Sequence, residues 1–284
     1  MGVGFVSLPK IGPVRYSVSR PLPAQPSSVT VVREPDNRFY VSFVVDEPAV
    51  ETVSPEIDER PHAGVDVGLI DLATVVRSDG TRTKLSNPRW ARTRAVKLAR
   101  AQRAYARTQK GSNNRQKARQ RVAVQHRKTR EARADHHHKV ALQLVRENQT
   151  VALETLNLNG LARTRLAKSF HDAGLGLLVQ LIVEKAPHHH TVVARTGRWE
   201  PTTQTCSVCG TPGGKKPLNV RAWTCTGCET MLDRDFNAAV NIIVAAGLTE
   251  TLNACGGSVR RRLAVADPMK QEPTEQTPPQ GAAA

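Results

Sequence analysis

The sequence lacks several features that would place it in common functional classes. None of its apolar runs approaches the roughly twenty residues that a membrane span requires. It shows no secretory signal, no Gly-x4-Gly-Lys phosphate loop and no convincing Ser-His-Asp or Cys-His arrangement. We therefore expect a soluble, intracellular protein whose mechanism is neither covalent nor driven by nucleoside triphosphates.

Negative charge is scarce. The 284 residues carry 41 Lys and Arg against 25 Asp and Glu, which gives a formal charge of +16. Two long helices are predicted over residues 87–148, with a break at 110–114. Between Arg89 and Arg133 Glu131 is the only acid, whereas a solvated helix face normally mixes both signs. This pattern indicates contact with nucleic-acid phosphates. The candidate residues are Arg92, Arg94, Lys97, Arg100, Arg103, Arg107, Arg115, Lys117, Arg119, Arg121, Arg127 and Lys128.

Cysteines are few, but four of the five form two Cys-x-x-Cys pairs separated by fifteen residues. This spacing is typical of a tetrahedral four-thiolate zinc site. Two disulfides or a redox-active dithiol are the alternatives, and disulfides would need an oxidising compartment. Four thiolates fill the coordination shell, so we predict a structural zinc ion, with Gly210 and Gly227 easing the two turns. The predicted ligands are Cys206, Cys209, Cys225 and Cys228.

A three-strand meander is predicted at 63–68, 72–77 and 81–85. In its first strand Asp66 shares a face with Gly64 and Gly68, which leaves open space around the carboxylate. Open space suits a metal ion bridged to phosphate, although a hydrogen-bonded structural Asp is the alternative.

Two later segments place further acids at the ends of predicted elements. A short strand at 150–154 ends in Glu154, beside the small residue Ala152 on the same face. A helix from about residue 235 to 247 begins near Asp233 and Asp235, and either could be its cap or a metal ligand. Three acids on separate elements are what two-metal phosphodiester hydrolysis requires, because carboxylates hold Mg²⁺ by oxygen.

The remaining segments are read more coarsely. We predict a β-hairpin from 28–33 and 38–45, an acidic linker at 47–61, a helix at 174–186 and a strand at 191–195. Composition shifts to Pro, Glu, Gln and Ala near the C-terminus, which indicates a disordered tail.

Four motifs, taken together and in this order, resemble those of the OrfB/TnpB transposon-encoded proteins. They are Gly64-Val-Asp-Val-Gly68, Leu153-Glu-Thr-Leu-Asn157, Pro201-Thr-Thr-Gln-Thr-Cys-Ser-Val-Cys-Gly210 and Asp233-Arg-Asp-Phe-Asn-Ala-Ala-Val-Asn-Ile242. The resemblance implies an α/β fold: an RNase H-like (RuvC) domain with an inserted helical hairpin and a zinc ribbon, preceded by a small β remnant.

The resemblance also implies a function. Its characterised members are RNA-guided DNA endonucleases related to type V CRISPR effectors, and others are described as transposases or accessory proteins. Carried over by position, Asp66, Glu154 and Asp235 are the catalytic, magnesium-binding acids, and Asp235 is preferred to Asp233 because it precedes x-Asn-Ala. The expected partners are DNA and a guide RNA from the flanking element, in the nucleoid region of a prokaryotic cytoplasm.

The implied domains are a partial wedge-like β region and linker (1–60), a RuvC-like core (61–201) with a basic hairpin at about 88–148, a zinc ribbon (202–231), a final RuvC segment (232–262) and a tail (263–284). The front resembles only the last part of the family's wedge domain, around Leu8-Pro-Lys-Ile-Gly12. A catalytically inactive nucleic-acid-binding remnant or regulator is therefore the alternative function. A zinc-ribbon scaffold for protein contacts is a weaker one, because it leaves the acids unexplained.

Overall fold

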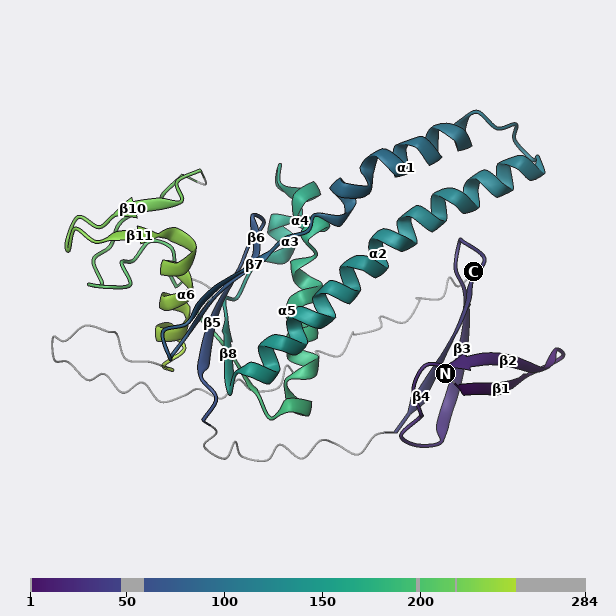
Figure 1. Cartoon of the computed structure of the whole chain (residues 1–284), viewed down its shortest axis with the longest axis horizontal. Helices are drawn as coiled ribbons and strands as arrows, with labels where there is room; N and C mark the ends of the chain where they lie inside the picture. The colour runs from purple at the N-terminus through teal and green to yellow at the C-terminus, as the bar shows by residue number, and fades with distance from the viewer. Residues whose placement is uncertain (1, 47–58, 198–199, 218, 249–284) are drawn as a thin grey trace, which may run out of the picture.

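The computed structural model describes residues 2–46, 59–197, 200–217 and 219–248 of the chain (Figure 1). Most of the predicted linker and all of the predicted tail, with Cys255, lie outside the described residues. Within the described part, no helix combines the length and apolar character that crossing a membrane demands.

A five-stranded mixed sheet forms the centre of the fold, in the order β7-β6-β5-β8-β9. β5, β6 and β7 form an antiparallel meander, while β8 pairs in parallel with both β5 and β9. The strands are β5 (His62–Val67), β6 (Asp71–Arg77), β7 (Arg82–Ser86), β8 (Thr150–Leu153) and β9 (Val192–Arg195). The predicted meander and both later strands are confirmed. In the turn between β6 and β7, the Asp79 carboxylate accepts from Thr81 N at 2.8 Å.

Helices cover both faces of this sheet. The helices are α1 (Trp90–Ala106), α2 (Asn113–Glu147), α3 (Leu158–Leu161), α4 (Ala167–Ala173), α5 (Leu175–Lys185) and α6 (Arg234–Ala245), with a 3₁₀ turn, η1 (Pro187–His189). Buried side chains of β5, β6 and β8 join Leu144 of α2 and Leu178 and Ile182 of α5 in one apolar cluster. α6 packs on β5 and β6 from the other side (Figure 1). Each central strand is therefore buried on both faces.

The close approach of α6 to β5 depends on Gly64. A Cβ atom at this position would overlap the Ala239 carbonyl oxygen and lie 3.0 Å from the Ile243 Cβ atom. The predicted open space beside Asp66 was therefore wrong on the Gly64 side, because helix α6 fills it. The missing side chain allows a helix to lie directly on the strand.

The basic region forms a helical hairpin, as predicted. Gly111 adopts a φ of +81° in the connection, and the Ser112 hydroxyl caps α2 by accepting from Arg115 N at 3.2 Å. The hairpin projects from the sheet, and no residue of α1 is fully buried (Figure 1). The large apolar side chains Trp90, Leu98 and Tyr105 of α1 are half-buried.

Two β-hairpins precede the sheet. β3 (Pro26–Arg33) and β4 (Phe39–Val45) form the predicted hairpin, whereas the hairpin of β1 (Gly2–Leu8) and β2 (Gly12–Val18) was not predicted. Its sequence signal was the alternation of the apolar residues Val14, Tyr16 and Val18 with the polar Arg15 and Ser17, which matches the alternating burial along β2. The Tyr16 and Phe43 rings join the two hairpins, with 5.3 Å between their centroids.

Candidate active site and nucleic-acid interface

Asp66 and Glu154 lie next to each other because their strands run in parallel. Val65 of β5 pairs with Leu153 of β8, so Asp66 and Glu154 occupy the next positions of the two strands, at the same edge of the sheet. Adjacent parallel strands are about 4.8 Å apart, which brings the two acids to one site.

Helix α6 contributes the third acid from its first turn. Asp233 is the N-cap, and its Oδ1 atom accepts from Asp235 N and Phe236 N, both at 3.0 Å. Its other oxygen accepts from Lys84 Nζ at 2.8 Å. Capping therefore occupies Asp233, whereas the Asp235 carboxylate makes only longer contacts, 3.5 Å to Arg221 and 3.9 Å to Lys84. Of the two aspartates, Asp235 is the one whose carboxylate is held less tightly and is better able to take a ligand.

The three acids interact electrostatically. Burial, followed by the charges of Glu154 and Asp235, raises the pKa of Asp66 to about 8. Burial also raises the pKa of Glu154, while a hydrogen bond from Thr202 Oγ1 to its Oε1 atom, at 3.2 Å, opposes the increase. Crowded, desolvated carboxylates of this kind are relieved by a divalent cation, which adds the missing positive charge. The donor set is all oxygen, as Mg²⁺ prefers.

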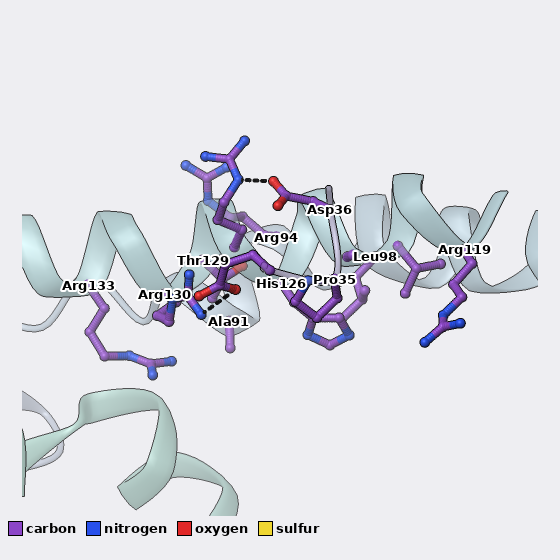
Figure 2. A pocket seen from close by; sticks show the side chains of 14 residues that line it. Pro35, Asp36, Ala91, Arg94, Leu98, Arg119, His126, Thr129, Arg130 and Arg133 are labelled. Atoms are coloured by element: carbon purple, nitrogen blue, oxygen red, sulfur yellow. Dashed lines mark hydrogen bonds and ion pairs between the residues drawn. The ribbon is translucent and has the colours of Figure 1, made fainter. Parts of the chain in front are cut away.

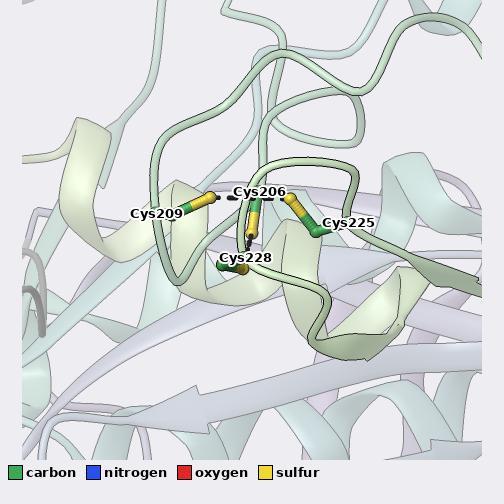
Figure 3. Close-up of side chains that lie close together, drawn as sticks. All are labelled: Cys206, Cys209, Cys225 and Cys228. Carbon is green, nitrogen blue, oxygen red and sulfur yellow. Dashed lines mark hydrogen bonds between the residues drawn. The ribbon is translucent and has the colours of Figure 1, made fainter.

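The four predicted cysteines converge in a second site (Figure 3). Their sulfur atoms all lie within 4.8 Å of one another, and no other group of three or more potential ligands in the described residues is as compact. The Cys206 and Cys228 sulfurs are 3.8 Å apart, and those of Cys209 and Cys225 are 3.5 Å apart. A tetrahedral zinc ion with bonds of about 2.3 Å requires sulfur atoms about 3.8 Å apart, whereas a disulfide requires about 2 Å. The cluster fits zinc.

The two cysteine turns are built alike. Gly210 and Glu229 each stand four residues after the first cysteine of a pair, with φ of +74° and +57°, and each donates its backbone N–H to that cysteine's carbonyl at 2.9 Å. The prediction for Gly210 is confirmed. Gly227 has another role, because a Cβ there would overlap the Thr211 side chain. The strands β10 (Ala222–Thr224) and β11 (Met231–Asp233) then lead into α6.

A basic cleft of about 660 Å³ lies between the helical hairpin and the turn that joins β3 to β4 (Figure 2). Its charged lining is mainly basic, because Glu34 and Asp36 are outnumbered by arginines and Glu34 is paired with Arg130. The arginines that line it, besides Arg127, are Arg94, Arg119, Arg130 and Arg133. The apolar side chains of α1 and α2 that line it are Ala91, Leu98, Val122 and Ala123. A positive wall beside an apolar surface suits a nucleic-acid strand, which offers phosphates and base faces.

Arg127 differs from the other predicted basic residues. It is buried, and its guanidinium pairs with Asp36 of the β3–β4 turn and with Glu131. Burial opposes ionisation of Asp36, but hydrogen bonds from Arg127 and Arg38 outweigh it and lower the pKa of this carboxyl. Arg127 therefore attaches the β-hairpin to α2 rather than facing a ligand. Arg94 and Arg115 are half-buried, and the rest of the predicted set is exposed.

Two family models match the chain. "OrfB_IS605: Probable transposase" matches residues 42–165, and "Cas12f1-like, TNB domain" matches residues 176–242. A Streptomyces pristinaespiralis protein named "Putative RNA-guided DNA endonuclease" is 39% identical over 251 residues, 87% of this chain and 60% of that protein.

The chain belongs to the OrfB/TnpB family. The Escherichia coli protein "Putative RNA-guided DNA endonuclease InsQ" is 28% identical over 95% of this chain and 67% of its own length. This TnpB-family chain thus spans about two thirds of the length of these relatives.

The fold of this family member resembles that of a type V effector. A structure described as "Cryo-EM structure of CRISPR-Cas12f Ternary Complex" superposes with a TM-score of 0.51 at 19% identity, over 78% of this chain and 46% of the other. The predicted class, an α/β RuvC-like fold, is confirmed.

Sequence reasoning missed several residues that surround the acids. Lys84 and Arg221 approach Asp235 from β7 and from the segment before β10, and Thr202 reaches Glu154. No local pattern marks these residues, because each is brought to the site by a different element. Asn237 and Asn241 did have a signal, since they lie four residues apart on one face of α6.

The raised pKa of Asp66 predicts a stability that depends on pH. In the metal-free chain Asp66 retains its proton up to about pH 8, whereas the unfolded carboxyl releases it near pH 3.8. The folded state then binds more protons, so the free energy of unfolding decreases as pH rises from about 4 to about 8. Asp66→Asn removes the ionisable carboxyl and with it this decrease in the free energy of unfolding. The variant should therefore be more stable than the wild type at pH 7 by more than about 1 kcal/mol.

Urea unfolding in magnesium-free buffer at pH 5 and pH 8 measures the effect. Asp79→Asn is the control, because a hydrogen bond lowers the pKa of Asp79 and its removal should bring no such gain. Equal pH dependence in Asp66→Asn and the wild type would contradict the assignment.

Proposed function

We propose that the chain is a Mg²⁺-dependent DNA endonuclease of the RuvC type, linked to a mobile element. The main support for this proposal is that two strands and a helix bring Asp66, Glu154 and Asp235 to one site. Bound Mg²⁺ would activate the attacking water and stabilise the leaving oxygen of a phosphodiester. The relatives' names, which include DNA endonucleases, support DNA as the substrate.

Different residues of the chain would have different roles at this site. Asp66, Glu154 and Asp235 would hold the ions, and the positive charge of the ions would favour the ionised carboxylates that burial and crowding disfavour. Lys84 and Arg221 border Asp235 and would attract the phosphate backbone. The site sits at the edge of the sheet beside the cysteine cluster, which we propose holds a structural zinc ion.

We propose that the basic helical hairpin and its cleft contact nucleic acid. The exposed members of the predicted set face solvent, and the nearby acids are already used: Glu131 is paired with Arg127 and Glu34 with Arg130. A guide RNA is the favoured strand for this surface, because both relatives are named RNA-guided. Such a chain would associate with the nucleoid.

We also propose the domain bounds that the family resemblance implies. On this assignment residues 61–201 and 232–262 form the nuclease core, 88–148 its basic hairpin and 202–231 the zinc ribbon. Residues 1–60 hold the two β-hairpins that the structure describes. An inactive nucleic-acid-binding regulator is the second candidate, favoured by the basic cleft, which does not depend on the acids.

Substitution of each acid tests the proposed nuclease. Asp66→Ala, Glu154→Ala and Asp235→Ala should each abolish Mg²⁺-dependent cleavage of plasmid DNA by the chain co-expressed with its flanking transcript, while DNA binding survives. Asp233→Asn is the matched control and should keep cutting, because Asn also caps helices well. Cleavage that persists in all three Ala variants would refute the assignment. Binding without any cutting by the wild type would favour the regulator.

The basic hairpin predicts a salt-dependent affinity for nucleic acid. Neutralising about six phosphates gives a log-log slope against salt near −5. Replacing Lys117, Arg119 and Arg121 together by Ala should make the slope shallower by about 2–3, measured by fluorescence anisotropy. Lys139→Ala is the control, since Lys139 is already paired with Asp135 at 2.7 Å. A slope that does not change in the triple variant would exclude this surface.

Metal analysis tests the zinc proposal. We expect one zinc ion per purified chain, and Cys206→Ser should lose it because the buried thiolate is one of four ligands. Cys255→Ser, which changes the cysteine that belongs to neither Cys-x-x-Cys pair, should retain full zinc. Zinc retained by Cys206→Ser would show that the four sulfurs are not its ligands.

A further inference from the structure

Thr202 links the two sites. Its side chain is buried, with the residue 3% exposed, and its hydroxyl donates to Glu154 Oε1 at 3.2 Å. It lies four residues before Cys206, at the start of the segment that enters the cysteine cluster. Within the part of the chain that the structure describes, this hydroxyl is the only side-chain donor to the Glu154 carboxylate.

The Thr202 backbone is in turn fixed by α6. The Asn241 side-chain amide donates to the carbonyls of Thr202 and Thr205, both at 2.7 Å. The Asn237 amide donates to the same two carbonyls at 3.4 Å and 2.8 Å, and its Oδ1 atom accepts from Ser207 N at 2.8 Å. Five hydrogen bonds from two side chains therefore hold one short segment, and Asn237 is almost completely buried.

This arrangement connects Asp235, Cys206 and the Thr202 hydroxyl through the hydrogen bonds of the two asparagines. Asp235 lies two residues before Asn237 on the same helix, and Cys206 directly follows the segment that both asparagines hold. The Thr202 hydroxyl connects this segment to Glu154, which directly follows β8. A shift of the cysteine segment relative to α6 would move this hydroxyl and release the Glu154 carboxylate, because nothing else described holds its Oε1 atom.

We infer that Thr202 is a positioning residue for the carboxylate site, and that Asn237 and Asn241 fix it there, so that the cysteine segment orients Glu154 toward the metal. The inference rests on the proposed function, since it assumes that Glu154 binds the ion. A purely structural role, in which the asparagines only attach the cysteine segment to α6, makes a different prediction. If the role is purely structural, substitution should change folding stability and zinc content but not the affinity for a divalent ion at Asp66.

The test measures Mn²⁺ binding to the full chain, by electron paramagnetic resonance of the free ion. Thr202→Val keeps the shape and removes the hydroxyl, and it should weaken Mn²⁺ binding by about tenfold or more. Thr202→Ser restores the hydroxyl and should lie within about twofold of the wild type. Thr202→Ala removes the hydroxyl without adding a methyl group, so it must behave as Thr202→Val. All variants should keep their zinc content and thermal midpoint.

The outcomes separate this inference from the proposed function. If Asp66→Ala loses Mn²⁺ while Thr202→Val binds it as the wild type does, the carboxylate site stands and the positioning role is wrong. If the wild type itself binds no Mn²⁺, the metal site and the inference both fail. If Thr202→Val loses zinc together with Mn²⁺ and Thr202→Ala does the same, the residue is structural and the inference is overturned.

Discussion

The contact of α6 with β5 at Gly64 is the constraint on which the rest of the site depends. Helix α6 begins with the cap of Asp233 and lies on the strand with its Ala239 carbonyl against a residue that has no Cβ. This approach carries Asp235 to the strand ends that bear Asp66 and Glu154. A larger residue in place of Gly64 would hold the helix away from the sheet.

The acids of the site and most of the excess basic side chains lie in different parts of the structure. The acids gather at one edge of the sheet, where burial and mutual repulsion raise the pKa of Asp66. The excess of positive charge lies on a hairpin that projects from this sheet, and its first helix, α1, has no buried residue. Such a helix gains little from packing, so we attribute its charge to the proposed nucleic-acid partner rather than to folding.

Hydrogen bonds from two asparagines join the cysteine segment to α6. The cluster and the carboxylates are consequently parts of one structure, even though thiolates and carboxylates prefer different metals. The family places a four-cysteine element within its nuclease domain. Here that element supplies a hydroxyl to Glu154, and this contact gives it a physical relation to the acids.

The sequence by itself determined the local elements. The predicted strands, the break near Gly111 and the two cysteine pairs follow from the preferences of neighbouring residues, and the structure places them where they were predicted. Residue patterns also singled out Asp66, Glu154 and the Asp233–Asp235 pair, and the resemblance of several motifs taken together chose Asp235 over Asp233. The β1–β2 hairpin escaped because glycine and proline hide its alternation.

Only the tertiary structure decided which residues meet. It buried Arg127 against Asp36, filled the space beside Gly64 with a helix and brought Thr202 to Glu154 across 48 positions of the chain. It also distinguished Asp233, whose carboxylate is occupied as a cap, from Asp235, whose carboxylate makes only longer contacts. The physical reason is that local pattern reports a residue's own backbone and exposure, whereas charge pairing and close packing depend on partners that are distant in sequence.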